Sequence, residues 1–223
     1  MATLLLRLAG PMQSWGTTSR FDERDTQLEP SKSGVIGLVC AALGRDRSEP
    51  VEDLVALRMG VRVEREGVPL RDYQTATGVL IASSGKPDLD RTVVSPRYYL
   101  ADAVFLAGLE GERGLLESIQ QALVNPVWPL ALGRKSCVPS LPVHLPQALV
   151  EQPLDAVLAQ WPCLLTGTAP ATPRRVVLEH PSEGSVRMDQ PVAPFAERRF
   201  GPRFVKSAMF FTGAAHVPDP TAA

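Results

Sequence analysis

The chain has 223 residues, of which 44% are hydrophobic and 21% charged, and its formal net charge is −1. These values describe a globular chain with one large or two small domains, and they exclude a disordered chain. They also exclude a protein that coats nucleic acid through a generally basic surface. The apolar runs are too short for a membrane helix of roughly 20 residues, and we expect neither a membrane segment nor a secretory signal.

The cysteines and histidines are few and far apart in the sequence. An odd number of widely spaced cysteines fits neither a disulfide framework nor a metal knuckle. We therefore predict a cytoplasmic protein with no metal and no cofactor. The residues concerned are Cys40, Cys137, Cys163, His144, His180 and His216.

The N-terminal part reads as a strand, a long loop and two helices. Residues 3–10 are apolar and predict a buried strand that ends at a Gly-Pro pair. A polar loop over 12–30 follows, and it is long enough to suggest a function. Residues 31–43 predict a buried helix that stops at a glycine. Residues 49–57 predict a second, short helix with a proline near its first turn.

The middle of the chain predicts strands and one helix. Residues 58–67 alternate apolar and polar residues, a pattern typical of a half-buried strand. Two strand-like runs flank a turn-rich tip, which predicts a protruding hairpin over about 73–97 that returns into a core strand. Residues 111–126 predict an amphipathic helix ended by a proline.

The C-terminal part reads as a proline-punctuated loop over 127–143, a short helix over 153–161 and late strands over 174–180 and 203–213. The last residues, 214–223, read as a disordered tail. This order of elements predicts an α+β fold in which helices lie on one face of an antiparallel sheet.

The start of the helix at residue 31 is unusually polar for a buried element. A serine there can cap the helix by accepting hydrogen bonds from free backbone amides, which is a common structural role. Alternatively the helix tip binds an anion, because amides and a partial positive charge point outward there. No Walker A glycine run precedes the lysine. The residues of this tip are Ser31, Lys32, Ser33 and Gly34.

Two stretches are locally basic, 118–150 and 187–206, although charge runs usually belong to a solvated surface. The first contains no acidic residue, and it includes a loop that resembles a phosphate-binding loop. Gly133 frees the backbone there, Arg134 and Lys135 supply positive charge, and Ser136 supplies a hydroxyl. The alternative is a surface loop with two incidental charges.

Aromatic and polar side chains mark two further candidate regions. Aromatics beside arginines at the roots of the hairpin suit stacked, unpaired bases, and the alternative is core packing. The hairpin candidates are Tyr73, Gln74, Arg97 and Tyr98. The long N-terminal loop is rich in hydrogen-bonding groups, although its acids offset its arginines, and its tryptophan can simply close the core. Its candidates are Gln13, Ser14, Trp15, Arg20, Arg24 and Thr26.

Several of these blocks, in this order, resemble one known family. The blocks are LLLRLAGPMQSWG, PSKSGVIGLVCAALGR, RDYQTA, RYYLADAVF and LGRKSCVPSLP. Together they are similar to the Cas-five branch of the RAMP superfamily, and within it to the subunit of type I-E CRISPR surveillance complexes (Cascade) that binds the guide RNA. The resemblance runs from residue 3 to about 211.

The resemblance implies a fold, a role and partners. It implies a ferredoxin-like (RRM-like) RAMP domain over 1–145 with a β thumb at about 73–97, and a smaller degenerate C-terminal part over 146–213. It implies a noncatalytic scaffold that holds the 5′ handle of the guide RNA (crRNA) for antiviral defence. The implied protein partners are the CasC backbone subunit and the large subunit CasA, with target DNA as an indirect partner. The helix tip, the N-terminal loop and the 134–136 loop would then form one cleft around the handle.

Two rival functions remain at this stage. Type I-C relatives of similar fold cleave precursor RNA without a metal, using a tyrosine and an adjacent lysine–histidine pair. Here Lys135 is followed by Ser136, and no Lys-His pair occurs in the chain. The second rival is a small-molecule α/β enzyme with a phosphate at the helix tip, but the sequence offers no second chemical group to accompany it.

Overall fold

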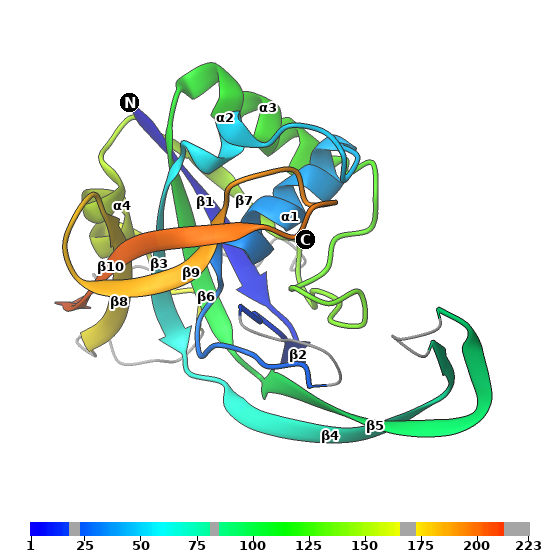
Figure 1. Cartoon of the computed structure of the whole chain (residues 1–223). Helices are drawn as coiled ribbons and strands as arrows, with labels where there is room; N and C mark the ends of the chain where they lie inside the picture. Colours follow the sequence, from blue (N-terminus) through cyan, green and yellow to red (C-terminus); the bar gives the residue numbers. More distant parts are fainter. Residues whose placement is uncertain (18–22, 81–84, 166–172, 212–223) are drawn as a thin grey trace.

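The computed structural model describes residues 1–17, 23–80, 85–165 and 173–211, and it is built on a seven-stranded antiparallel sheet. The strand order is β7-β1-β6-β3-β8-β10-β9 (Figure 1). A second sheet of three strands has the order β2-β5-β4. The strands of the large sheet are β1 (Ala2–Ala9), β3 (Arg58–Arg65), β6 (Val104–Gly111), β7 (His144–Val150), β8 (Pro173–His180), β9 (Ser185–Pro191) and β10 (Phe200–Phe211). The other elements are β2 (Met12–Gln13), β4 (Val68–Leu80), β5 (Pro87–Ala101), α1 (Lys32–Leu43), α2 (Glu52–Val55), α3 (Arg113–Val124) and α4 (Leu154–Gln160).

The first two thirds of the chain form a ferredoxin-like core. The order β1-α1-β3-β6-α3-β7 along the chain is the βαββαβ pattern, and the four strands pair in the order β7-β1-β6-β3. The predicted ferredoxin-like α+β fold is therefore confirmed. Strand β7 was not predicted from the sequence, because Pro146 and the polar residues of the strand obscure the alternation that marks a strand.

Local sequence explains the two elements that matter most for the site. Every residue of β1 is buried, as expected of an apolar strand covered on both faces. Helix α1 begins at Ser31, whose hydroxyl accepts a hydrogen bond from the Gly34 amide, and it ends at Gly44 in the left-handed conformation. The predicted cap, helix and stop are all confirmed.

The C-terminal third extends the same sheet. Strand β8 pairs with β3, β10 pairs with β8, and β9 forms the far edge. The boundary expected near residue 145 falls inside β7, and strands from both sides of it pair within one sheet.

Helices lie on both faces of the sheet, whereas the sequence predicted helices on one face. Helices α1 and α3 pack over the residues of β1 that include Leu4 and Leu6. Helix α4 packs over Leu5 and Leu106 on the other face. Since neighbouring residues of a strand point to opposite faces, these two clusters lie on opposite sides of the sheet.

Strand β3 corrects the expectation of a half-buried strand. Its residues 59–64 are all buried, because the strand lies between β6 and β8 in the middle of the sheet. Its polar residues Arg62 and Glu64 point inward and pair with each other. The alternation in the sequence therefore marked a buried ion pair and not a solvent-facing side.

The predicted hairpin is confirmed and is longer than expected. Strands β4 and β5 pair from Val68 opposite Ala101 to Leu80 opposite Pro87. Figure 1 shows the hairpin curving away from the large sheet, with its root beside β2. Its exposed apolar residues are Val68, Leu70, Tyr73, Leu80, Leu89 and Val94.

Some predictions lie outside the described residues. These are the candidate Arg20, the last residues of the predicted strand over 203–213, and the disordered tail expected over 214–223. Among the described residues, no helix is long and apolar enough to cross a membrane. Within the same ranges, no group of three or more histidine, cysteine, aspartate or glutamate side chains is placed to hold a metal ion.

Candidate functional site

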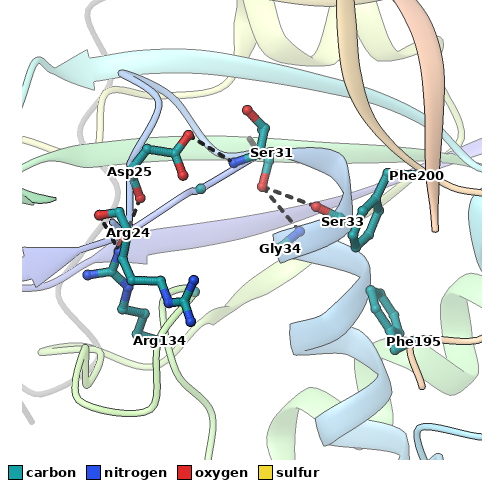
Figure 2. A pocket seen from close by; sticks show the side chains of 12 residues that line it. Arg24, Asp25, Ser31, Ser33, Gly34, Arg134, Phe195 and Phe200 are labelled. Atoms are coloured by element: carbon teal, nitrogen blue, oxygen red, sulfur yellow. Dashed lines mark hydrogen bonds between the residues drawn. The ribbon is translucent and has the colours of Figure 1, made fainter. Parts of the chain in front are cut away.

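A cavity of about 300 Å³ lies where four segments meet (Figure 2). The segments are the loop after β2, the tip of α1, the turn at residue 133 and the connection from β9 to β10. Three of them are the segments expected to form one cleft, and the structure brings these three together. That the cleft holds the RNA handle stays a prediction. The lining residues are Ser14, Gly16, Thr17, Arg24, Asp25, Ser31, Ser33, Gly34, Gly133, Arg134, Phe195 and Phe200.

The turn that carries Arg134 is held by its two ends. Leu132 and Cys137 are buried, and the Leu132 amide donates a hydrogen bond of 2.8 Å to the Cys137 carbonyl. The Cys137 amide donates to the Arg134 carbonyl, also at 2.8 Å. Gly133 has a φ of 92°, which favours glycine. The turn is therefore a fixed platform rather than a loose surface loop.

The Arg134 side chain joins two loops and faces the cavity. Its Nη2 donates to the carbonyls of Arg24 at 2.8 Å and Asp25 at 3.1 Å. Its guanidinium lies over the ring of Tyr99, with 4.8 Å to the ring centroid. Its Nη1 is buried and has no hydrogen-bond partner among the described residues. Arg134 therefore holds the two loops together at the cavity wall and places a positive charge there.

The loop after β2 contributes backbone and small side chains, while its larger predicted residues form the wall behind. Gln13 is buried and donates to the carbonyls of Leu8 and Ala103, and its Oε1 accepts from Trp15 Nε1. The Trp15 amide donates to Thr26 Oγ1. Gln13, Trp15 and Thr26 thus hold the loop and do not line the cavity. Of the predicted residues here, Ser14 and Arg24 line it.

The helix tip corrects the expectation that Lys32 reaches the ligand. Ser31, Ser33 and Gly34 line the cavity, but Lys32 does not. The Lys32 side chain is 1% exposed, and its Nζ donates to both carboxylate oxygens of Glu179, at 2.9 and 3.0 Å. Burial lowers the pKa of Lys32, an effect that Glu179 opposes. Lys32 therefore has a structural role in a buried ion pair, and its charge does not reach a ligand in the cavity.

The amides of the tip are also partly used inside the protein. The Lys32 amide donates to Asp189 at 2.8 Å, and Asp189 in turn pairs with Arg203. The Gly34 amide is used by the Ser31 cap. A Cβ at Gly34 would lie 2.7 Å from the Trp15 ring, so this glycine makes room for the tryptophan and not for a ligand. The polar helix tip is thus mainly an internal junction, and its hydroxyls are what it offers to the cavity.

We expect Lys32→Met to destabilise the protein without removing its site. Breaking a largely buried ion pair leaves Glu179 uncompensated and costs about 3 kcal/mol. For a chain of this length that lowers Tm by roughly 6–12 °C. Thermal unfolding measures the first effect. Titration of the folded variant with RNA measures the second, and a loss of affinity as large as that of an Arg134 variant would contradict this assignment.

We expect Gly133→Ala to damage both stability and site. A Cβ there would lie 1.7 Å from the Ser14 carbonyl oxygen, so two walls of the cavity would have to move apart. The strain costs at least about 2 kcal/mol, or roughly 4–8 °C in Tm. The control is Gly85→Ala, which also has a positive φ, of 65°, but meets no atom within 4 Å. Equal losses of Tm in the two variants would show that the contact with Ser14 is unimportant.

The remaining predicted residues, on the hairpin and next to the turn at residue 133, do not line the cavity. The Arg24 carbonyl accepts a hydrogen bond from the Tyr98 amide, and the backbone of Arg24 forms an isolated parallel β-bridge with Arg97. The root of the hairpin is therefore attached to the cavity rim. Tyr73 is 67% exposed on the hairpin, and the Tyr98 ring lies beneath the guanidinium of Arg71. Gln74 donates to Asp72. Lys135 and Ser136 are exposed next to the turn but outside the lining.

The aromatic side of the cavity was not predicted from the sequence. Phe195 and Phe200 come from the β9–β10 connection, far along the chain from the other lining residues. The basic stretch over 187–206 was noted, yet much of it is internally paired. Arg187 pairs with Glu29, and Arg203 with Asp189. The FAERRF run at 195–200 could have indicated this side of the cavity, because it places two phenylalanines around two arginines.

These features define the class of protein. A ferredoxin-like core, a sheet extended by C-terminal strands and a projecting hairpin form an α+β protein of the RAMP type. The family model described as CRISPR-associated protein (Cas_Cas5) matches residues 3–206. The chain belongs to this family.

Individual relatives agree with the family. The chain is 32% identical over 176 residues to the CRISPR system Cascade subunit CasD of Escherichia coli (strain K12), covering 71% of this chain and 77% of that protein. A solved structure described as a crystal structure of a Cas protein has 51% identity and a TM-score of 0.77, with 97% of this chain and 95% of that chain covered. A chain from a CRISPR RNA-guided surveillance complex has 32% identity and a TM-score of 0.77, with 98% and 96% covered.

Proposed function

We propose that this chain is the RNA-binding Cascade subunit that holds the 5′ handle of crRNA in a type I-E CRISPR system. The observation that carries the proposal is the match over 98% of the chain, at 32% identity, to a chain of an RNA-guided surveillance complex. The similarity to the Cascade subunit CasD supports the same role. The chain would act in the cytoplasm as part of a ribonucleoprotein complex for antiviral defence.

The charge distribution suits the binding of one short RNA segment. The net charge is −1, so the surface as a whole does not attract a polyanion. The cavity instead gathers Arg24, Arg134 and the hydroxyls of Ser31 and Ser33 in one place. Arginines and hydroxyls are typical ligands of phosphates and base edges. Local binding of this kind leaves the rest of the surface for protein partners.

We propose that the subunit is noncatalytic. The two histidines within the described residues, His144 and His180, do not line the cavity. The His180 Nδ1 accepts hydrogen bonds from the amides of Ser182 and Glu183, which assigns it to a turn. The exposed Lys135 is followed by Ser136 where type I-C nucleases carry histidine. The endoribonuclease alternative therefore lacks the lysine–histidine pair of its type I-C relatives.

The exposed hairpin is the proposed contact with the neighbouring subunits. Its apolar residues include Tyr73, Leu80 and Leu89, which are 67%, 69% and 78% exposed. Exposed apolar residues gathered on one projecting element are typical of an interaction surface. We propose the CasC backbone subunit and the large subunit CasA as its partners, with target DNA reached only through the assembled complex.

Binding and cleavage assays test the proposal together. The purified chain is titrated with a labelled repeat-derived handle RNA and with a scrambled RNA of equal length, at several salt concentrations and without metal. We expect preference for the handle, affinity that falls as salt rises because counterions are released on binding, and intact RNA. Equal affinity for both RNAs would contradict handle recognition, and cleaved products would favour the endoribonuclease.

A further inference from the structure

We propose that the cavity receives a single unpaired nucleotide of the handle, with its base against Phe195 and Phe200 and its phosphate at Arg24 and Arg134. The inference rests on the proposed function, since it takes the ligand to be RNA. It goes further by stating which part of the nucleotide occupies which part of the cavity. It also assigns a ligand-contacting role to two phenylalanines that lie outside every motif recognised in the sequence.

The cavity has two chemically different ends. Figure 2 shows Arg24 and Arg134 together at one side, Phe195 and Phe200 together at the other, and the tip of α1 between them. A nucleotide has the same polarity, with an anionic phosphate at one end and an apolar, stackable base at the other. The arrangement therefore favours one orientation of the nucleotide.

The aromatic end is fixed from outside the cavity. Arg47 Nη2 donates to the Phe195 carbonyl at 3.1 Å, and the Ala196 amide donates to the Arg47 carbonyl at 2.8 Å. The Arg198 amide closes the turn by donating to the Phe195 carbonyl. Phe200 begins β10 and is 37% exposed. Bases stack on such partly exposed rings with little sequence preference.

The cationic end is held in place by its own hydrogen bonds. Nη2 of Arg134 donates to two backbone carbonyls, which fixes the guanidinium at the cavity wall without a ligand. Arg24 is exposed beside it and adds charge. Ser31 and Ser33 offer hydroxyls midway, where a ribose would lie. Asp25 is also in the lining, and its carboxylate accepts a hydrogen bond from the Thr17 amide.

The size of the cavity restricts the ligand. About 300 Å³ is at the lower end of the range of small-molecule sites. That volume suits one nucleotide and is too small to enclose a base pair. A nucleotide that fills the cavity is therefore unpaired, with its base turned away from its neighbours.

A coupling experiment between protein and RNA tests the proposal. Handle RNAs with one abasic nucleotide at each position in turn are titrated against the wild-type chain, Phe200→Leu and Phe195→Leu. For the wild type we expect one abasic position to weaken binding about tenfold, the effect of losing one stacked base. In the phenylalanine variants the same abasic RNA should cause little further loss, because the stacking is already gone. Phe210→Leu is the control, since Phe210 packs on the other face of the sheet and should leave the abasic penalty unchanged.

The outcomes separate this inference from the proposed function. If the wild type binds the handle but no abasic position couples to either phenylalanine, the nucleotide pocket is wrong and the function stands. If the wild type does not prefer the handle over a scrambled RNA, both are wrong. Phe200→Leu alone suffices for the test should Phe195→Leu fail to fold, because Phe200 is partly exposed.

Discussion

Replacing Arg134 with alanine is expected to weaken binding of the handle RNA by about ten- to a hundredfold. A hydrogen bond to a charged group contributes about 1.5–3 kcal/mol, and each 1.4 kcal/mol is a factor of ten in affinity. Arg134 lines the cavity, and its guanidinium is the charged donor that a phosphate oxygen there would contact. The substitution also removes the bonds to the carbonyls of Arg24 and Asp25, so the loops would separate and Tm should fall modestly.

The neighbouring lysine provides a matched control for this loss. Lys135→Ala removes a positive charge one residue away, but Lys135 is exposed and does not line the cavity. We expect only the small, salt-dependent loss that a distant surface charge causes. Titration of both variants with the same handle RNA at low and high salt measures the difference. Equal losses would show that Arg134 acts only as a charge, and unchanged affinity in Arg134→Ala would contradict the site.

Glu64→Gln is expected to cause the largest loss of stability, about 3–5 kcal/mol, the cost of removing one partner of a buried ion pair. Glu64 and Arg62 are fully buried in β3, and Arg174 approaches Glu64 from β8 with 3.1 Å between Nε and Oε2. The Arg62 guanidinium also donates to the carbonyls at residues 158, 161 and 162, which attaches β3 to the end of α4. Without the carboxylate, Arg62 and Arg174 lose the buried counterion that they share.

Thermal unfolding measures this effect. The expected loss corresponds to a fall in Tm of roughly 6–20 °C for a chain of this length. Glu66→Gln is the control, since Glu66 also pairs with an arginine, Arg175, but is 58% exposed. An exposed pair contributes about 0–1 kcal/mol, so its Tm should hardly change. Similar Tm values for the two variants would mean that the buried network does not stabilise the fold.

The elements predicted correctly are those whose structure depends on residues close together in the sequence. The apolar run of β1, the cap and stop of α1 and the turn-rich hairpin tip each carry their own information. Strand β9 was missed although its partner β10 follows it closely in the chain. Strand β7 was missed because its own alternation is weak and its pairing with β1 comes from a distant segment. The burial of β3 was misjudged for the same reason, since its cover by α4 lies about 100 residues away in the chain.

The site shows the same division between local and distant information. Its segments were predicted because each carries a polar or basic motif of its own. The direction of Lys32 could not be predicted, because Glu179 is 147 residues away. Phe195 and Phe200 were missed because a phenylalanine in the sequence reads as core, and only the folded sheet brings β10 to the tip of α1. The residues nearest the cavity are therefore a mixture of predicted and unpredicted ones.

Co-purification with RNA tests the central claim most directly. The tagged chain is expressed with its neighbouring operon proteins and a CRISPR array, and the RNA that co-purifies is sequenced. The account predicts uniform guide RNAs with an intact 5′ handle, in a complex that contains a multicopy backbone protein, and a reduced yield of RNA with Arg134→Ala. A chain that purifies alone and free of RNA, or with RNA lacking a common 5′ end, would contradict it.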